Sequence, residues 1–428
     1  MDTIFALATA LGRSGVGVIR ISGPESVKAL GYLNASIPDP HTACLRSLRS
    51  VEGTLLDEAL VVVFPQYQSF TGEQTVEIQC HGSVAVIKAI LEELSHIPQL
   101  RPADPGEFTR RALGNGRLDL AQVEGLADLL EAETEVQRRQ ALQVFSGELG
   151  RLAEEWRSDL IRAAALVEAT IDFADEDVPV DVAPEVRQLI EKTRKSLECE
   201  ISGIHMAERV RAGFEVAIVG APNVGKSTLL NSLAGRDAAI TSEFAGTTRD
   251  VIEVRMDLSG LPVTFLDTAG IRETDDVVES IGIGRAKQRA ESADLRIFLV
   301  ESGRSPDFEI HDDDIILQAK ADLLETGSGG ISGRTGQGVP DLIQRISSIL
   351  KNRSSAVGVA TRLRHQVAMK RACVSLSRAR ELIELGEAQA DLVAEELRSS
   401  VRALDFLVGR VDVEVVLDEI FSSFCIGK

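Results

Sequence analysis

The sequence has few of the features that mark a secreted, zinc-binding or membrane protein. Its five cysteines are scattered without a CxxC pair, which argues against a disulfide framework and against a zinc ribbon. No run of about 18 uncharged apolar residues occurs, so no membrane partner is expected. The first residues lack the basic flank and long apolar stretch of a secretory signal. We therefore expect a cytoplasmic protein with reduced thiols.

Positive charge is also scarce. The chain has 46 Lys and Arg against 66 Asp and Glu, a formal net charge of −20. Non-specific coating of nucleic acid needs Lys and Arg surfaces that neutralise phosphates, so any RNA contact has to be local. The net charge is −2 for residues 1–117 (10 cations, 12 acids), −10 for 118–211 (11 and 21), −7 for 212–355 (15 and 22) and −1 for 356–428 (10 and 11). The acidity is concentrated in the middle of the chain.

The length and the apolar content indicate several packed domains. At roughly 150 residues per domain, 428 residues favour about three, and 44% apolar residues suffice for real cores. Residues 1–117 mix β-like runs with helical stretches and predict an α+β domain. Residues 118–211 and 356–428 show apolar residues at helical spacing. Residues 212–355 alternate β-rich runs with helices, as a doubly wound domain does.

We therefore predict a multidomain chain in which an α/β domain is inserted into a helical domain built from two distant segments. Such an insertion is cheap when the two ends of the inserted domain lie close together at the surface. The first strand of the inserted domain should be FEVAIVG and its last helix DLIQRISSIL.

The strongest local motif is GAPNVGKS at Gly220–Ser227, which matches G-x-x-x-x-G-K-[ST] between a predicted strand and a predicted helix. In such a P-loop the backbone N–H groups face nucleotide phosphates, Lys226 reaches the phosphate oxygens and Ser227 can ligate magnesium. GTTRD then offers Thr248 as a second magnesium ligand, and FLDTAG places Asp267 at a strand end. This order of motifs predicts a GTPase whose switch loops close only while GTP is bound.

Base selection should come from AKAD, residues 319–322. The carboxylate of Asp322 can accept hydrogen bonds from N1–H and the exocyclic amine of guanine. The usual motif is NKxD, and Ala319 replaces its Asn, which removes one side-chain hydrogen bond and lowers the expected nucleotide affinity. ISGRTG, residues 331–336, resembles the loop that follows, with Gly333 where Ala is common.

The group that orients the attacking water does not follow from the usual pattern. In Ras-like enzymes a Gln after the DxxG motif does this, but here that position is Ile271, whose apolar side chain cannot. Carboxylates in RETDDVVESIG are candidates. Taken by itself, Glu279 in this stretch could equally be a charged residue at a helix start.

Three further stretches carry a resemblance to one family: TGEQTVEIQCHGS (71–83), PGEFTRRALGNGRLDLAQVEGLADLL (105–130) and CIGK (425–428). With the inserted GTPase domain, the chain resembles from end to end the MnmE (TrmE) family of bacterial tRNA modification GTPases. The resemblance implies a homodimer with an N-terminal domain like tetrahydrofolate-binding modules, a discontinuous helical domain and a Ras-like P-loop domain.

The resemblance also implies a reaction with the FAD- and NADH-using partner MnmG. The two proteins install an aminomethyl or carboxymethylaminomethyl group at C5 of the wobble uridine of certain tRNAs. A one-carbon tetrahydrofolate derivative supplies the methylene carbon, and GTP hydrolysis is stimulated by potassium. The residues do not distinguish glycine from ammonium as the amine donor.

Matching the family's motifs to this sequence assigns the nucleotide site. The family's potassium-binding Asn matches Asn223, the loop over the ion matches Ser242–Thr247, and the water-positioning Glu matches Glu279. A potassium ion beside the phosphates can neutralise charge that builds up in the transition state, which suits a chain without the Gln. The expected catalytic residues are Glu279, Lys226 and Asn223; the potassium ligands Asn223, Ser242, Phe244 and Thr247; and the magnesium ligands Ser227 and Thr248. The expected GTP-binding residues are Asn223, Val224, Gly225, Lys226, Ser227, Thr228, Ser242, Glu243, Phe244, Ala245, Gly246, Thr247, Thr248, Asp267, Thr268, Ala269, Gly270, Lys320, Asp322, Ser332, Gly333 and Arg334.

For the folate pocket, motif matching points to Arg20, Glu77, Arg117 and Lys428. Cationic side chains suit the glutamate tail of a folate, and a carboxylate suits the pterin edge. The family often has Lys where Arg117 stands. Cys425 could take part in the modification chemistry as a thiolate, or the tail could serve only to place Lys428 beside the pocket. Both readings stay open.

Two other classes of function fit parts of the sequence. A GTP-dependent switch in ribosome or RNA assembly, as in Era, would need a basic RNA-binding appendage, and residues 356–428 with a net charge of −1 show none. A folate-binding scaffold with a degenerate nucleotide site would account for Ala319.

Overall fold

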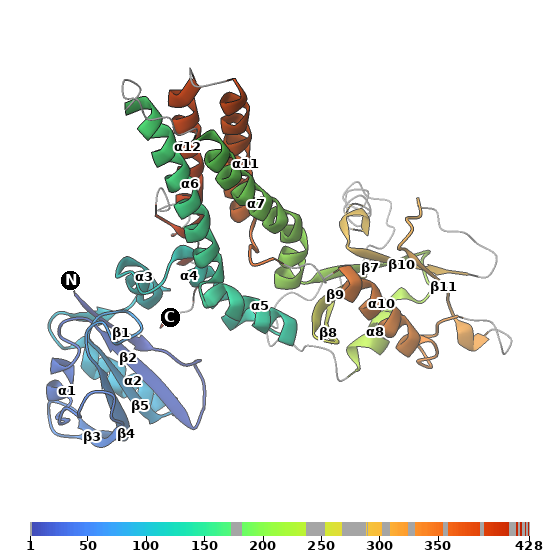
Figure 1. Cartoon of the computed structure of the whole chain (residues 1–428). Coiled ribbons are helices and arrows are strands. Elements are labelled where there is room, and N and C mark those ends of the chain that lie inside the picture. Colours follow the sequence, from blue (N-terminus) through green and yellow to red (C-terminus); the bar gives the residue numbers. More distant parts are fainter. Residues whose placement is uncertain are drawn as a thin grey trace, which may run out of the picture. The chain divides into compact units, whose positions relative to one another are not determined.

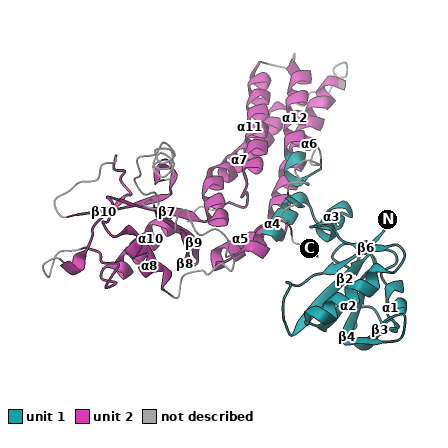
Figure 2. Ribbon diagram, turned by 180° about the vertical axis from the view of Figure 1, so that it is seen from behind, with its two compact units in different colours: residues 1–127, 404–428 teal, residues 128–403 magenta. Residues whose placement is uncertain are grey.

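The computed structural model describes residues 2–172, 182–236, 253–267, 290–301, 309–323, 330–353, 358–385 and 389–410, together with Gln288, Leu417, Ile420, Phe421, Phe424 and Gly427. Its packing divides the chain into two compact units, shown in teal and magenta in Figure 2. The first unit holds residues 1–127 and 404–428, and the second holds residues 128–403. Figure 1 labels their elements.

The first unit is built on a six-stranded sheet in the order β3-β4-β5-β2-β1-β6. All neighbouring strands are antiparallel except β1 and β6, which are parallel. One face packs against two helices through a core that includes Ile90, Ile19 and Ile78. The elements are β1 (Thr3–Leu7), β2 (Val16–Ser22), α1 (Lys28–Tyr32), β3 (Cys44–Arg49), β4 (Leu55–Phe64), β5 (Thr75–His81), α2 (Val84–Ser95), β6 (Leu100–Pro102) and α3 (Glu107–Gly114).

The C-terminal residues belong to this first unit. Phe421 and Phe424 form a small core with Val123 of α4 (Leu120–Glu131). Gly106, with φ +67°, makes this packing possible because a Cβ there would lie 2.7 Å from the Phe421 ring. The chain end is therefore folded back onto the N-terminal part.

The helical part of the second unit contains α5 (Glu135–Phe145), α6 (Glu148–Asp172), α7 (Ala183–Ala212), α11 (Leu363–Glu384) and most of α12 (Ala390–Val408). Thr134 starts α5 with a capping box to Gln137. The Trp156 indole donates to Ser196 Oγ at 2.9 Å and links α6 to α7. After the inserted part, Val359 N donates to Glu200 Oε2 of α7 at 3.0 Å, so that segments on both sides of the inserted part pack together, as the two helical sequence blocks predicted.

The inserted part contains a five-stranded sheet in the order β11-β10-β7-β9-β8. The sheet is parallel except for β8, which runs antiparallel to β9. The strand predicted from FEVAIVG is β7, and the helix predicted from DLIQRISSIL lies within α10, so both predictions are confirmed. The elements are β7 (Phe214–Gly220), α8 (Lys226–Ala234), β8 (Glu253–Leu258), β9 (Leu261–Asp267), β10 (Leu295–Val300), β11 (Ile315–Gln318), the 3-10 turn η1 (Ala321–Leu323) and α10 (Val339–Arg353).

The two ends of the inserted part meet at Asp294. Its carboxylate accepts a hydrogen bond from Glu215 N at 2.8 Å and pairs with Arg209 Nε at 2.8 Å, and its carbonyl accepts from Arg353 Nη1 at 2.6 Å. Burial raises the pKa of Asp294, although its backbone hydrogen bond and Arg209 oppose the shift. The expectation that entry and exit lie close together is confirmed.

The fold class predicted from the sequence is confirmed. It comprises an α+β N-terminal part, a helical part from distant segments, and an inserted α/β part of the P-loop type. The division into four segments at 117/118, 211/212 and 355/356 stays a prediction. None of the helices that the structure describes is both long and apolar enough to cross a membrane.

Candidate functional site

The predicted P-loop connects the end of β7 to the start of α8. Gly220 lies so close to β10 that a Cβ there would come within 2.5 Å of the Leu299 carbonyl oxygen. Gly225 precedes α8 with φ +114°, and Asn223 adopts φ +60°. The left-handed conformation at Gly225 favours glycine, which explains its place in the motif. The sequence therefore folds here into a tight turn at the N-terminus of α8.

Lys226 is held beneath this turn with only 5% of its surface exposed. Its Nζ donates to the carbonyls of Gly220 and Ala221 at 2.6 and 2.9 Å. Burial lowers the pKa of Lys226, while the nearby carboxylate of Asp267 opposes this shift. An ammonium has three N–H donors, so one is left for a phosphate oxygen.

Ser227 and Asp267 come together from two different elements. The hydroxyl of Ser227, at the start of α8, donates to Asp267 Oδ2 at the end of β9, with a distance of 2.7 Å. Hydroxyl and carboxylate oxygens are the donors that magnesium prefers. These two residues fit a magnesium ion bound with a nucleotide, and the role of Ser227 as a magnesium ligand stays a prediction.

A cavity of about 230 Å³ lies beside the P-loop. It brings the P-loop together with AKAD and ISGR, two neighbouring stretches that lie far from it in the sequence. Its lining includes the predicted residues Asn223, Val224, Gly225, Thr228, Lys320, Asp322, Ser332, Gly333 and Arg334. The motifs predicted to hold phosphate and base thus form one site.

Ala319, which stands where the usual motif has Asn, is buried beside the P-loop cavity. Ala319 is 7% exposed, packs in the core of the inserted part, and its N–H donates to the Val300 carbonyl at 2.9 Å. Its methyl group offers no hydrogen bond to the base or to the P-loop. Asp322 follows on η1, and Lys320, with φ +58°, pairs with Glu301 at 3.3 Å.

Several predicted residues lie outside the described part of the chain. These are Ser242, Glu243, Phe244, Ala245, Gly246, Thr247, Thr248, Thr268, Ala269, Gly270, Ile271, Glu279, Cys425 and Lys428.

In the first unit, the predicted folate residues Arg20 and Glu77 form an ion pair. They are opposite each other on β2 and β5, and Arg20 Nε donates to Glu77 Oε1 at 2.9 Å. Their side chains are 17% and 20% exposed. The Arg20 guanidinium also lies 5.4 Å from the ring centre of Phe70. A ligand that binds here would therefore contact an ion pair, in which Glu77 neutralises the charge of Arg20, and not an unpaired cation.

Of the other two predicted folate residues, the structure describes Arg117, and it describes Gly427 next to Lys428. Arg117 is exposed, and a Cβ on Gly72 would lie 3.1 Å from Arg117 Cγ. Gly427 approaches β1 so closely that a Cβ there would overlap the Leu7 carbonyl oxygen. Because β1 pairs with β2, the C-terminal segment reaches the sheet beside the strand that carries Arg20.

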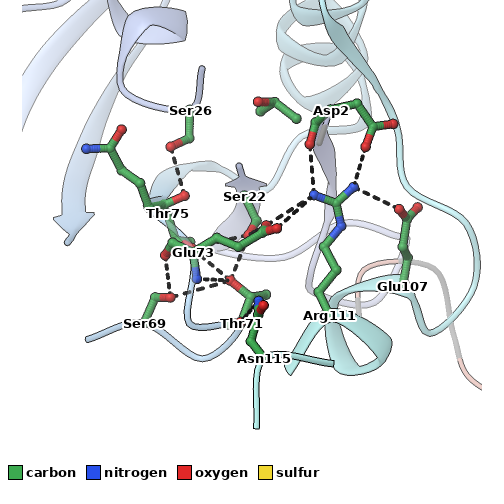
Figure 3. A network of polar contacts seen from close by, with 12 residues as sticks. Asp2, Ser22, Ser26, Ser69, Thr71, Glu73, Thr75, Glu107, Arg111 and Asn115 are labelled. Atoms are coloured by element: carbon green, nitrogen blue, oxygen red, sulfur yellow. Dashed lines mark hydrogen bonds and ion pairs between the residues drawn. The ribbon is translucent and has the colours of Figure 1, made fainter. Parts of the chain in front are cut away.

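A polar network around Arg111 was missed by the sequence reasoning (Figure 3). Arg111 pairs with Asp2 at 2.9 Å, Glu107 at 3.0 Å and Glu73 at 3.1 Å. Glu73 also accepts from Ser22 Oγ at 2.7 Å. Burial alone would raise the pKa of Glu107, but hydrogen bonds from Arg101 and Arg111 outweigh it and lower that pKa. The network fixes the loop that carries Gly72. In the sequence it was indicated only by the charged residues Glu73, Glu107 and Arg111, which lie within the stretches 71–83 and 105–130.

Gly333 provides a test of the nucleotide site. A Cβ at this position would lie 2.6 Å from Leu229 N and 2.7 Å from Leu229 Cα, which are backbone atoms of α8. Although Ala is common at this position of the loop, the loop of this chain approaches α8 too closely for a Cβ. We therefore expect Gly333→Ala to push the loop away from α8 at a cost of about 1–3 kcal/mol and to weaken guanine nucleotide binding, measured by fluorescent GDP titration. Gly235→Ala is the matched control because its Cβ would meet only Asn231 O at 3.5 Å. Equal affinity of Gly333→Ala and the wild type would contradict this packing.

Two family models match the chain. One is described as GTP-binding protein TrmE N-terminus and matches residues 3–117, and the other is described as MnmE helical domain and matches residues 120–425. Among solved structures, Era of Aquifex aeolicus bound to GDP.AlF4− is 32% identical, covering 32% of this chain and 56% of that chain at a TM-score of 0.25. The G domain of the T. maritima FeoB iron transporter is 23% identical, covering 32% and 97% at a TM-score of 0.23.

Similar curated proteins cover the chain completely. The tRNA modification GTPase MnmE of Ruegeria sp. strain TM1040 is 59% identical over 428 residues, with 100% of both chains covered. Proteins of the same name from Roseobacter denitrificans and Paracoccus denitrificans are 58% and 49% identical, again over 100% of both chains. With its P-loop site assembled and these relatives matched from end to end, the chain belongs to the MnmE family and is a GTPase that takes part in tRNA modification.

Proposed function

We propose that this chain is a potassium-stimulated GTP hydrolase that acts with an MnmG partner at C5 of the wobble uridine of certain tRNAs. The group installed is aminomethyl or carboxymethylaminomethyl, and the setting is the cytoplasm. The observation that carries the proposal is the assembled nucleotide site in a chain that matches proteins named tRNA modification GTPase over its full length. The Era-like assembly switch has no comparable support.

In this proposal the described residues bind and orient the nucleotide. The N–H groups of the P-loop turn and Lys226 bind the phosphates of GTP. Ser227 and Asp267 hold magnesium, which neutralises charge on the β- and γ-phosphates when bound. Asp322 selects guanine at the cavity beside the loop. Thr248, outside the described residues, completes the magnesium ligands.

Hydrolysis is assigned to Glu279 and to a potassium site. Ile271 cannot orient water, so a carboxylate from another position is needed, and Glu279 is our choice. Asn223 lies on the lining of the cavity, next to the phosphate end of the P-loop, where it suits a potassium ligand. Ser242, Phe244 and Thr247 would complete that site. A bound potassium ion supplies positive charge for the transition state.

The folate-binding role is assigned to the first unit. Arg20 and Glu77 sit on neighbouring strands, with Arg117 at the nearby loop and Gly427 against β1. These positions support a pocket in which Lys428 binds the folate from the tail, and Cys425 lies two residues from Gly427 for a role in the modification chemistry. Folate supplies the one-carbon unit when bound. The proposal also includes a homodimer.

The first experiment separates binding from hydrolysis. We expect Lys226→Ala to abolish GTP binding, because the buried ammonium is lost from the phosphate site. Glu279→Ala should leave binding near the wild-type value and slow turnover by roughly tens to thousands-fold. Nucleotide titration and phosphate release measure the two quantities. A Glu279→Ala variant that hydrolyses GTP at the wild-type rate would remove Glu279 from the mechanism.

The second experiment concerns the alkali ion. We expect GTP turnover to be much faster in potassium than in sodium buffer of the same ionic strength, and Asn223→Ala to lose most of that difference while still binding GDP. Pro222, the neighbouring exposed position, supplies a control as Pro222→Ala. Equal turnover in both buffers would refute the role given to Asn223.

The third experiment concerns the tRNA product. A strain without this protein should lack the C5 substituent on wobble uridine when its tRNA is digested and analysed by mass spectrometry. Wild-type protein should restore it and Lys226→Ala should not. Unchanged nucleosides in the deletion strain would overturn the proposed reaction and leave the GTPase assignment standing.

A further inference from the structure

The acidic chain contains one long segment without a carboxylate. Residues 342–380 have no Asp or Glu but nine Lys and Arg. The net charge of −1 for residues 356–428 does not reveal this local positive charge. It is the sum of +6 for residues 356–380 (six cations, no acids) and −7 for residues 381–428 (4 cations, 11 acids). The segment average was therefore a wrong guide to the local charge. Residues 363–380 of this acid-free segment lie on α11.

Helix α11 has one buried side and one exposed side. On the buried side, the residues His365, Met369 and Leu376 are completely buried. The Ala372 carbonyl on this side accepts a hydrogen bond from Ser400 Oγ of α12 at 3.3 Å. Figure 1 shows α11 beside α7 and α12 in the helical part. We name the opposite side the α11 outer face, which consists of Leu363, Val367, Lys370, Arg371, Val374 and Arg378.

The cations of this face are less closely paired than other arginines of the helical part. Lys370 and Arg371 are exposed and have no hydrogen bond or ion pair with any residue that the structure describes. Arg378 approaches Glu396 only to 3.8 Å. In contrast, Arg398 and Arg402 on α12 pair with carboxylates at 2.6 and 2.7 Å. The charge of the outer face is therefore available to an external anion.

We propose that the α11 outer face binds the phosphate backbone of tRNA. The inference rests on the proposed function, which supplies tRNA as the anionic partner. Arg371 and Arg378 are seven residues apart, about 10.5 Å along the helix and on the same side of it, so that the cations form a row. Unpaired Lys and Arg gain affinity for phosphates by releasing counterions, without reading sequence. Residues 342–380 themselves add no acid that would repel RNA. The nearest carboxylates of other helices, Glu396 and Glu191, lie beside Arg378 and Arg380 toward the C-terminal end of α11.

A protein partner with an acidic helix is the competing occupant, because Val367 and Val374 lie among the cations. The tRNA assignment is favoured because Lys370 and Arg371 are adjacent and have no partner among the residues that the structure describes, which suits closely spaced phosphates. The apolar residues of the face are separated by Lys370 and Arg371 and form no continuous stripe. The two occupants predict different results in one binding experiment.

The test uses the full-length protein and a fluorescein-labelled tRNA transcript, with anisotropy titrations between about 50 and 200 mM KCl. The Lys370→Ala/Arg371→Ala variant should bind on the order of ten-fold more weakly at low salt, and its slope of log affinity against log salt should fall by about two. Arg398→Ala/Arg402→Ala, which also removes two exposed cations of the helical part, should change affinity less than about two-fold. Lys370→Arg/Arg371→Lys should bind as the wild type does.

Three results would overturn the assignment: equal binding by the first variant, equal loss in the α12 control, or no salt-dependent binding by the wild type. Normal tRNA binding with loss of a protein partner would assign the face to that partner instead. Thermal unfolding and GTP turnover in potassium should be unchanged in all variants. A failure of the inference is thereby distinguished from a failure of the proposed GTPase mechanism, which the Lys226 and Glu279 variants test.

Discussion

The nucleotide site depends on the parallel pairing of β7 with β9 and β10. Parallel strands bring their carboxyl ends to one edge of a sheet, and ligands bind at that edge in open α/β sheets. Here Asp267 at the end of β9 pairs with Ile218, two residues before the Gly220 end of β7, and Gly220 pairs with Leu299 of β10. The AKAD segment follows β11, which pairs with β10. Without this pairing the P-loop, the magnesium carboxylate and the base-selecting turn would not converge.

The same constraint explains how tightly the site is packed. Gly220 touches the end of β10, and Gly333 touches the first turn of α8, both at distances that leave no room for a Cβ. Lys226 can be buried because two carbonyls of the loop accept its hydrogen bonds. Burial lowers the pKa of Lys226, and the negative charge of Asp267 opposes this shift. A bound phosphate would also favour the charged form of Lys226.

The first unit shows a different use of distant segments. Arg111 forms ion pairs with Asp2, with Glu73 in the loop before β5, and with Glu107 of α3. Phe421, Phe424 and Gly427 pack onto the same unit. The predicted folate residues Arg20 and Glu77 are held in a cross-strand pair on this framework. The network therefore supports the region where the chain end and the sheet meet.

The sequence by itself determined the elements and motifs that are local. FEVAIVG had to be a buried strand and GAPNVGKS its phosphate loop, because periodicity and glycine placement act over a few residues. Only the tertiary structure decided which distant side chains meet. It brings Gly333 against α8 and pairs Arg20 with Glu77, and it gives Lys370 and Arg371 on α11 no partner within the described part of the chain. The reason is physical, since ion pairing and close approach depend on which faces pack together, and no pattern along the chain encodes the distance between residues that folding brings side by side.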